Sequence, residues 1–380
     1  MTTTNTRVAI VGCGYTELTR EPTASIADLA VEACSAATAD AGLDLASLDG
    51  INLQMHHGDP PTAEVARRLG FDTLRWSADG GLGIVALGRA ATAIDNGEAR
   101  SIVVCKIMES GNPVSTPLID PETGRVAGRN QFDVPYGLGY TMQRIGLTSR
   151  RWMNRYGITA EHLGWLCVTQ REHAMLNPNA FFKEPLTMDD YLSSRWIADP
   201  VRLLDCDRPV NGAWAYVITS EDIAKTTTHD PVFVLSWVDS PIEMLEFYLL
   251  EEDLGPAPSP WLRPLYAESG LTPDDLDVWM LYDGFSFFPL QWMEALNLVP
   301  RGGSGPYVEG GTRIRFDGEH PTNTHGGQLS EGRLHGAGHI LEAVQQLRGT
   351  AGLRQRDGAQ NAVVTTAFST TGAAAILSRI

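Results

Sequence analysis

Short apolar runs alternate with segments of helical period along the first hundred residues. The runs 7–13, 48–54 and 101–107 have the length of strands and include β-branched residues. Between them, apolar positions recur every three to four residues over 25–41 and 84–97, which predicts amphipathic helices. This alternation is typical of βαβ units, so the pattern predicts a largely parallel sheet with helices on its faces.

The second half of the chain repeats this order. Residues 41–51 (AGLDLASLDGI) align with 269–279 (SGLTPDDLDVW), with glycine, leucine and aspartate at matching positions. A glycine-rich turn with a helix and then an apolar strand follow in both halves, at 325–347 and 361–368 in the second. Because three successive elements agree in order, a duplicated α/β unit explains the pattern better than chance similarity. We therefore predict two halves, residues 1–228 and 229–380.

A segment of different composition interrupts the first half at about 109–207. It is rich in Tyr, Trp, Arg and His and has few strand signals. Two helices are predicted within it, and the second begins at Thr159 and ends before Pro178. Large insertions on duplicated α/β scaffolds usually cover the active site. We therefore predict that this cap segment forms the substrate pocket.

The formal charge of −17 at pH 7 excludes several classes of partner. Such a charge repels nucleic acid and anionic membrane surfaces, and no strong basic patch overrides it. No apolar window reaches the roughly 18 to 20 residues of a membrane helix. The amino terminus lacks the features of a signal peptide, so we expect a cytoplasmic protein.

The cysteines and histidines do not form a recognisable metal or disulfide pattern. The five cysteines are odd in number and scattered, without a CxxC pair, and His56 and His57 lack a third ligand. We expect neither a disulfide framework nor a metal in this chain. Each cysteine is predicted to be a small buried apolar side chain, and the thiolate of Cys206 is further disfavoured by its acidic neighbours Asp205 and Asp207.

Seven stretches spread along the chain carry a family resemblance. They are VAIVGCGYTELTR, GGLGIVALGRAATAIDNGEA, EHAMLNPNAFF, LDCDRPVNGAWAYVITSED, LYDGFSFFPLQWMEAL, NTHGGQLSEGRLHGAGHILEAVQQLRG and TTGAAAILSR. Taken in order, they resemble the thiolase superfamily, and within it the sterol-carrier-type lipid-transfer branch close to the steroid side-chain retro-aldolases, over essentially the whole chain. The resemblance implies an α/β fold of five layers, αβαβα, with two related halves and a CoA-thioester site between them. It also implies a homodimer and a small zinc-ribbon/OB-fold partner protein.

The chain departs from the thiolase pattern at the residues that carry acyl transfer. Thiolases need a nucleophilic cysteine in C-x-S-G-x-x-A at the start of a buried helix, where the helix dipole lowers the thiol pKa. Aligning Gly83 and Ala86 to that pattern places Gly80 at the nucleophile position. The second family cysteine would fall at 366–368, where none occurs, and Arg333 replaces the activating histidine. Thiolysis or Claisen condensation through an acyl-enzyme is therefore not expected.

A thiolase scaffold without a nucleophile can still stabilise a CoA enolate. Retro-aldol cleavage of a β-hydroxyacyl-CoA needs a base for the β-hydroxyl and donors for the enolate oxygen, but no covalent intermediate. The resemblance implies a bulky substrate, such as the CoA thioester of a steroid side chain. Two other functions stay open. The chain could be a non-catalytic acyl-CoA or lipid-binding scaffold that works with a partner, or an atypical acyltransferase with a partner-supplied nucleophile.

Tyr282 and Asp283 follow a predicted strand, where the family has Asn of NEAF or His of HDCF. A phenol that projects from the carboxyl edge of the sheet can relay the β-hydroxyl proton if neighbouring positive charge lowers its pKa. Alternatively, Tyr282 packs against the phenylalanines at 285, 287 and 288. Asp283 is the second candidate base, or it caps the following helix.

His325 and Arg333 are the other candidate catalytic residues. His325 precedes Gly326 and Gly327, whose N–H groups can approach a thioester oxygen, so it is a candidate oxyanion donor or acid/base group. Arg333 could hold an enolate oxygen or depress the pKa of Tyr282, or it could pair with an anion elsewhere. His335, on the same stretch, is a candidate substrate contact.

Three further positions are candidate substrate contacts. Gly80 stands at the nucleophile position, and His173 belongs to the family stretch H-x-x-x-N-P-x-A, where a structural role is equally compatible. Tyr248 could reach the pocket, although an amphipathic stripe also explains it. Basic residues for the CoA phosphates are predicted in one cluster of the cap segment, which a solvated helix face would also explain. That cluster is Arg144, Arg150, Arg151 and Arg155.

Overall fold

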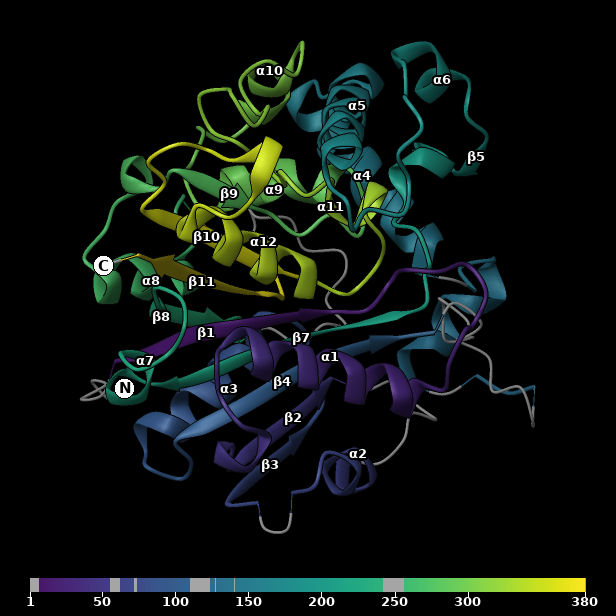
Figure 1. Ribbon diagram of the computed structural model, residues 1–380. Helices are drawn as coiled ribbons and strands as arrows, with labels where there is room; N and C mark the ends of the chain where they lie inside the picture. Colours follow the sequence, from purple (N-terminus) through teal and green to yellow (C-terminus); the bar gives the residue numbers. More distant parts are fainter. Residues whose placement is uncertain are drawn as a thin grey trace.

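The protein is described here from a computed structural model, which covers residues 7–54, 62–71, 74–109, 124–126, 128–139, 141–241 and 256–379. Within these residues, the main sheet contains nine strands in the order β3-β2-β4-β7-β1-β8-β11-β10-β9 (Figure 1). The strands, in that order, are Trp76–Asp79, Gly50–Gln54, Ser101–Met108, Gly212–Ser220, Val8–Tyr15, Val232–Asp239, Ala373–Ser378, Asn361–Thr366 and Val278–Met280.

The sheet consists of two units with the same topology. In the N-terminal unit β2 and β4 are parallel, whereas β4–β7 and β7–β1 are antiparallel. In the C-terminal unit β9 and β10 are parallel, and β10–β11 and β11–β8 are antiparallel. The units meet where β1 pairs with β8 at two residue positions. We propose to divide the chain at 228/229, just before β8.

The sheet is less parallel than the sequence predicted. Three of its eight strand pairings are parallel, namely β2–β3, β2–β4 and β9–β10. The short connection of residues 367–372 between β10 and β11 cannot hold a crossover, so these strands form a hairpin. β7 follows the cap segment and likewise returns antiparallel to β4.

The predicted repeat is also present in individual contacts. Gly42 and Gly270 each end a helix with a positive φ, of 70° and 72°. The Asp49 carboxyl accepts hydrogen bonds from two consecutive N–H groups at the start of β4, at 2.8 and 2.9 Å. The Asp277 carboxyl accepts the equivalent pair at the start of β10, at 2.8 and 2.9 Å. Matching residues in the two halves therefore perform matching structural tasks.

Helices and the two sheet units form five layers. Helices α1 (Ile26–Asp40) and α2 (Thr62–Arg68) pack on the outer face of the N-terminal unit. Helices α3 (Ile84–Asp95) and α12 (Ala337–Arg348) share one apolar core with strands of both units and so lie between them. Helices α8 (Arg263–Ser269) and α9 (Phe287–Ala295) cover the outer face of the C-terminal unit. The fold is therefore the predicted thiolase-like αβαβα arrangement.

The cap segment contains the two predicted helices. These are α4 (Thr141–Tyr156) and α5 (Ala160–Leu176), and α5 begins with the Thr159 hydroxyl accepting the His162 N–H and ends at Asn177. They lie at the edge of the C-terminal unit, close to α11 (Figure 1). Among the described residues, no helix is long and apolar enough to span a bilayer. The remaining short elements are α6 (Met188–Ser193), β5 (Trp196–Ala198), β6 (Val201–Arg202), α7 (Glu221–Ala224), α10 (Ser304–Val308) and α11 (Gly327–Ser330).

Candidate active site

Gly80, which the sequence pattern aligns with the thiolase nucleophile, precedes α3 and presents no ionisable side chain. Gly80 has a φ of 78°, and no atom lies within 4 Å of where its Cβ would be. Two backbone N–H groups at this end of α3 are held by side chains. Gly83 donates to Gln54 Oε1 at 2.8 Å, and Ile84 donates to Thr366 Oγ1 at 3.0 Å. Thr366 is one of the residues that stand where the second thiolase cysteine would be.

This end of α3 lies next to the carboxyl end of β9. A Cβ on Gly83 would lie 2.2 Å from Thr366 Oγ1 and 3.2 Å from the His335 carbonyl oxygen. A Cβ on Gly336 would lie 2.9 Å from the same Thr366 oxygen and 3.6 Å from the Tyr282 ring. Thr366 and the turn at His335, where φ is 48°, therefore lie between Gly83 at the start of α3 and Tyr282.

Tyr282 is 8% exposed and belongs to the apolar core of the C-terminal unit. Its N–H donates to Thr365 Oγ1 at 2.8 Å, and its ring stacks on Phe288 and His339 at 6.3 and 6.2 Å between centroids. Burial, and next the charge of Asp207, raise the pKa of the phenol above its usual value. The lowered pKa that was one possible effect of Arg333 is not found, because burial outweighs the opposing effect of the Arg333 charge. The phenol is protonated at neutral pH.

Asp283 is completely buried, and its carboxyl holds three neighbours in place. It accepts hydrogen bonds from the N–H groups of Gln328 at 2.9 Å and Leu329 at 3.3 Å, and His339 Nε2 lies 3.0 Å from its Oδ1. The carboxyl thus caps α11, rather than the helix that follows it in sequence. These contacts occupy both oxygens and fix the imidazole of His339 behind Tyr282.

His325 and Glu331 form a buried pair. His325 Nε2 lies 3.6 Å from Glu331 Oε2, and both side chains are almost completely buried. Burial lowers the pKa of His325 well below its usual value and raises that of Glu331 well above it. Neither ring nitrogen of His325 has a hydrogen-bond partner among the described residues. A neutral imidazole in this position can donate to an incoming oxygen or accept a proton.

Arg333 lies beside Asp207. Its Nη1 lies 3.8 Å from Asp207 Oδ1, and its Nε has no hydrogen-bond partner among the described residues. Burial raises the pKa of Asp207 to about 7, although the Arg333 charge acts in the other direction. The Asp207 N–H donates to the Gly284 carbonyl at 3.2 Å, which places the carboxyl close to the Tyr282 loop. A carboxyl with this pKa can take up and release a proton near neutral pH.

Sequence reasoning missed the functional potential of four residues, namely Asp207, Gln170, Gln328 and His339. The side-chain amides of Gln170 and Gln328 are buried and without hydrogen-bond partners among the described residues. Such groups are rare in folded cores, where polar atoms are normally paired. One signal for Gln328 is its position in the glycine-rich stretch that contains His325 and Arg333. The sequence around Asp207 indicates only an acidic neighbour of Cys206.

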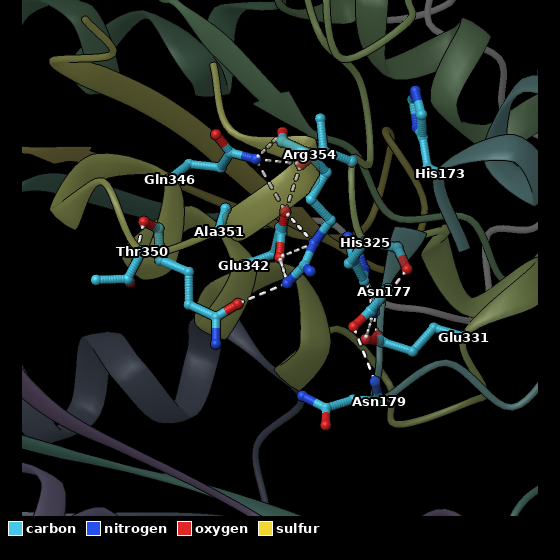
Figure 2. A network of polar contacts seen from close by, with 12 residues as sticks. His173, Asn177, Asn179, His325, Glu331, Glu342, Gln346, Thr350, Ala351 and Arg354 are labelled. Atoms are coloured by element: carbon cyan, nitrogen blue, oxygen red, sulfur yellow. Dashed lines mark hydrogen bonds and ion pairs between the residues drawn. The ribbon is translucent and has the colours of Figure 1, made fainter. Parts of the chain in front are cut away.

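A second buried polar network lies behind His325 (Figure 2). Arg354 donates to both carboxyl oxygens of Glu342, from Nε to Oε1 at 3.0 Å and from Nη2 to Oε2 at 2.8 Å, and Asn177 donates to Glu331 Oε1 at 2.7 Å. His173 stands apart from this network in Figure 2. Its Nδ1 bonds to the Asn323 carbonyl at 3.2 Å, and its Nε2 accepts the Phe316 N–H at 3.0 Å. Both ring nitrogens are thus engaged by the backbone.

The two glycines after His325 are in close contact with their surroundings. A Cβ on Gly326 would lie 2.6 Å from that of Ala174, and one on Gly327 would lie 2.0 Å from Asp283 Oδ2. The Gly326 N–H is already donated to the Asn323 carbonyl at 2.9 Å. Tyr248 lies outside the described residues.

The free cysteines are all buried, as predicted. Burial raises the pKa of Cys206, and the neighbouring charges of Asp205 and Asp207 add a smaller increase. No group of three metal-ligating side chains occurs within the described ranges, and His56 and His57 lie outside them. The side chains that the described site brings together, such as His325, Asp207 and Arg333, can transfer protons and stabilise an oxyanion.

Several known proteins are similar to this chain in sequence and in fold. Residues 263–379 match the family described as Thiolase C-terminal domain-like. The chain is 35% identical to the 17-hydroxy-3-oxo-4-pregnene-20-carboxyl-CoA lyase of Mycobacterium tuberculosis, over 91% of this chain and 92% of the relative. It is 33% identical to the steroid side-chain-cleaving aldolase of Thermomonospora curvata, over 94% of each. The solved structure of an Ltp2-ChsH2(DUF35) aldolase superposes with a TM-score of 0.87 at 31% identity, over 100% of this chain and 99% of that chain. The chain therefore belongs to the thiolase superfamily, in the branch that contains these side-chain-cleaving lyases and aldolases.

Proposed function

We propose that the protein is a carbon–carbon lyase that cleaves a bulky β-hydroxyacyl-CoA thioester by a retro-aldol reaction. The products are a ketone or aldehyde and a shorter acyl-CoA. One observation carries the proposal: the nucleophile position at Gly80 is vacant, while proton-carrying and hydrogen-bonding side chains surround the adjacent Tyr282. This combination favours enolate chemistry over acyl transfer.

In this proposal, Asp207 and Tyr282 carry out the proton transfers. Asp207 accepts the β-hydroxyl proton as the Cα–Cβ bond breaks, and the bonding electrons pass into the thioester enolate. His325, Arg333 and the Gln328 amide stabilise the enolate oxygen. Tyr282, protonated at neutral pH, donates its proton to Cα and regains one from Asp207. Asp283 acts through others, as a positioning residue for α11 and His339.

The substrate class and the partners belong to the same proposal. The printed activities of the two curated relatives support a steroid side-chain CoA thioester as substrate. The solved Ltp2-ChsH2(DUF35) aldolase supports a small partner protein, which we propose to be of the zinc-ribbon/OB-fold type. We also propose that the protein is a homodimer. A location in the cytoplasm is part of the proposal, and the five unpaired cysteines support it.

The test is cleavage of a tertiary β-hydroxyacyl-CoA by the protein, alone and with its co-purifying zinc-bearing partner. Release of ketone and shortened acyl-CoA in equal amounts is the expected result. Matched variants Tyr282→Phe, His325→Ala and Arg333→Ala should each slow ketone release. If all three leave the flux unchanged, the chain is a non-catalytic binding scaffold and the proposal is wrong.

A further inference from the structure

The N-terminal sheet unit carries buried polar side chains on the face that packs against α3. Leu53 and Cys105 belong to the apolar core on the opposite, outer face, together with α1. Because side chains alternate along a strand, their neighbours Gln54 on β2 and Lys106 on β4 point to the inner face. These two residues are partners in the strand register, and they are 1% and 0% exposed. Two polar side chains are therefore buried side by side in the layer where α3 begins.

The amide of Gln54 lies at the turn that contains Gly80. The Gly80 N–H donates to the Leu53 carbonyl at 2.8 Å, so the turn continues the pairing of β2 with β3. At the other end of the turn, the Gly83 N–H donates to Gln54 Oε1 at 2.8 Å. The Lys106 ammonium donates to the backbone carbonyl of Gln54 at 2.9 Å. Both the backbone and the side chain of Gln54 are thus held in place beside the turn.

The nitrogen of this amide is an unused donor. Nε2 of Gln54 is buried and forms no hydrogen bond with any residue that the structure describes. The Gly83 N–H can bond only to an acceptor, which identifies the oxygen of the amide and leaves the nitrogen unpaired. Buried donors are normally paired, because an unpaired one loses its contact with water without compensation. The position of Nε2 therefore suggests a partner that is not part of the protein.

Unfilled space lies at the same turn. Apart from its neighbours in the chain, no atom of a described residue lies within 4 Å of where a Cβ on Gly80 would be. Gly80 is also partly exposed, so a ligand can reach this space from outside. At the other end of the turn, by contrast, a Cβ on Gly83 would lie 2.2 Å from Thr366 Oγ1. The turn thus combines open space at one end with an unpaired donor beside it.

We infer that the side-chain amide of Gln54 donates a hydrogen bond to the β-oxygen of the β-hydroxyacyl thioester, bound in the space at Gly80. The inference rests on the proposed function, because cleavage begins at that oxygen. A nucleophile lies within about 3.5 Å of the carbon that it attacks, so the position aligned with the thiolase nucleophile must be open to the reacting carbon of a thioester. Without a side chain at Gly80, the β-carbon and its substituents can occupy this space, within reach of Gln54.

An amide donor suits an oxygen that changes from a hydroxyl to a carbonyl. Both oxygens accept hydrogen bonds, so one N–H group can serve the substrate, the transition state and the ketone product. When the hydroxyl proton passes to Asp207, negative charge develops on the oxygen, and the N–H group stabilises it without giving up its own proton. Gln54 thus binds the departing ketone, while His325 and Arg333 stabilise the enolate of the other fragment.

Support of the turn alone is the alternative role for Gln54, and three variants separate the two roles. Gln54→Met removes the amide and keeps the length of the side chain. Gln54→Glu keeps an acceptor for the Gly83 N–H and removes the donor. Thr366→Val is the matched control, because Thr366 Oγ1 accepts the Ile84 N–H at 3.0 Å and so supports the same start of α3.

The direct test compares calorimetric binding of β-oxooctanoyl-CoA with that of octanoyl-CoA, which lacks the β-oxygen. Neither carries a β-hydroxyl, so neither is a retro-aldol substrate. The wild type should bind the oxo compound about five- to tenfold more tightly, as expected for one added hydrogen bond. Both Gln54 variants should lose this ratio, whereas Thr366→Val should weaken both ligands equally and keep it. With native circular dichroism throughout, equal affinities in the wild type, an unchanged ratio in both Gln54 variants, or loss of the ratio in Thr366→Val would overturn the inference.

Turnover separates this inference from the proposed function. In Gln54→Met, kcat/KM for cleavage of a tertiary β-hydroxyacyl-CoA should fall at least about tenfold, because the hydrogen bond also stabilises the transition state. A ratio of affinities that depends on Gln54, without cleavage by the wild type, would support the β-oxygen site and refute the lyase. Cleavage with the same kcat/KM in the wild type and in Gln54→Met would support the lyase and refute the β-oxygen site.

Discussion

The two halves of the molecule share a strand order but place different chemistry where they meet. In the N-terminal half, the start of α3 presents Gly80 and backbone N–H groups bound by Gln54 and Thr366. In the C-terminal half, the end of β9 presents Tyr282 and Asp283 against a glycine-rich stretch with buried polar side chains. The repeat therefore preserves the scaffold, while the residues of the proposed site differ between the halves: Tyr282, His325 and Arg333 belong to the C-terminal half, and Asp207 belongs to the cap segment of the N-terminal half.

This difference shows that the fold does not depend on the nucleophile. The glycines and aspartates that shape each half are repeated, as at Gly42 and Gly270 or Asp49 and Asp277. The reacting side chains are not repeated, because they are attached at strand ends and turns rather than built into the core. The predictions below test this separation of scaffold and chemistry.

The largest effect is expected for Tyr282→Phe. The change removes the phenolic proton and keeps the ring that stacks on Phe288 and His339. We expect kcat to fall by about 10² to 10⁴, the usual contribution of a positioned acid or base, with thioester affinity preserved. Steady-state kinetics and equilibrium binding measure the two quantities.

The matched control is Tyr266→Phe in the same half. Tyr266 lies on α8, at the outer face of the sheet, and its hydroxyl donates to the Leu296 carbonyl at 2.7 Å. The Tyr266→Phe variant should lose about 1 kcal/mol in the free energy of unfolding, and its kcat should stay unchanged. Equal losses of kcat in both variants would assign Tyr282 a packing role only.

Asp283→Asn should mainly lower stability. The carboxyl holds two N–H groups of α11 and His339 in a fully buried position, and the amide can satisfy only part of these contacts. We expect a loss of about 2–4 kcal/mol in the free energy of unfolding, measured by urea denaturation. Asp274→Asn, an exposed aspartate of the same half, should change it by less than about 0.5 kcal/mol.

Asp207 should make stability depend on pH. Its pKa of about 7 in the folded chain exceeds the value of 3.8 expected when unfolded, so the folded state binds the proton more tightly. The free energy of unfolding contributed by this group should fall as the pH rises from about 4 to 7, by up to about 1.4 kcal/mol per pH unit. Comparison of Asp207→Asn with the wild type across this range isolates the contribution. Parallel stability curves would show that Asp207 titrates normally.

The smallest effects compare the repeated glycines. Gly270→Ala places a Cβ in open space and should cost only about 1 kcal/mol for the positive φ. Gly42→Ala has a similar φ, and its Cβ would also lie 2.2 Å from Thr228 Oγ1, so it should cost more. Thermal unfolding of both variants measures the difference, and equal losses would mean that the Thr228 side chain moves aside freely.

The sequence was sufficient to predict much of the scaffold. Helical periodicity and the Thr159 capping position predicted α5, and the aligned stretches around Gly42 and Gly270 predicted the duplication. Both signals are local, because a helix face or a turn is encoded in neighbouring residues. Strand direction is not local, and the antiparallel return of β7 and β11 was therefore missed.

The residues of the candidate site were predictable from the sequence only where they belong to a family motif. Tyr282, His325 and Arg333 occur in stretches that resemble the family. Asp207 becomes a candidate base only through its burial beside Arg333, and the raised pKa of Tyr282 follows from the same burial. Both depend on contacts between segments far apart in the chain, which composition and spacing do not contain.

The most direct test of the central claim is intact-mass measurement of the protein during turnover of a β-hydroxyacyl-CoA, with free CoA assayed in parallel. If the vacant position at Gly80 rules out acyl transfer, the protein mass should stay unchanged and no CoA should be released while ketone accumulates. An acyl adduct on the protein, or release of CoA in step with product, would contradict the account.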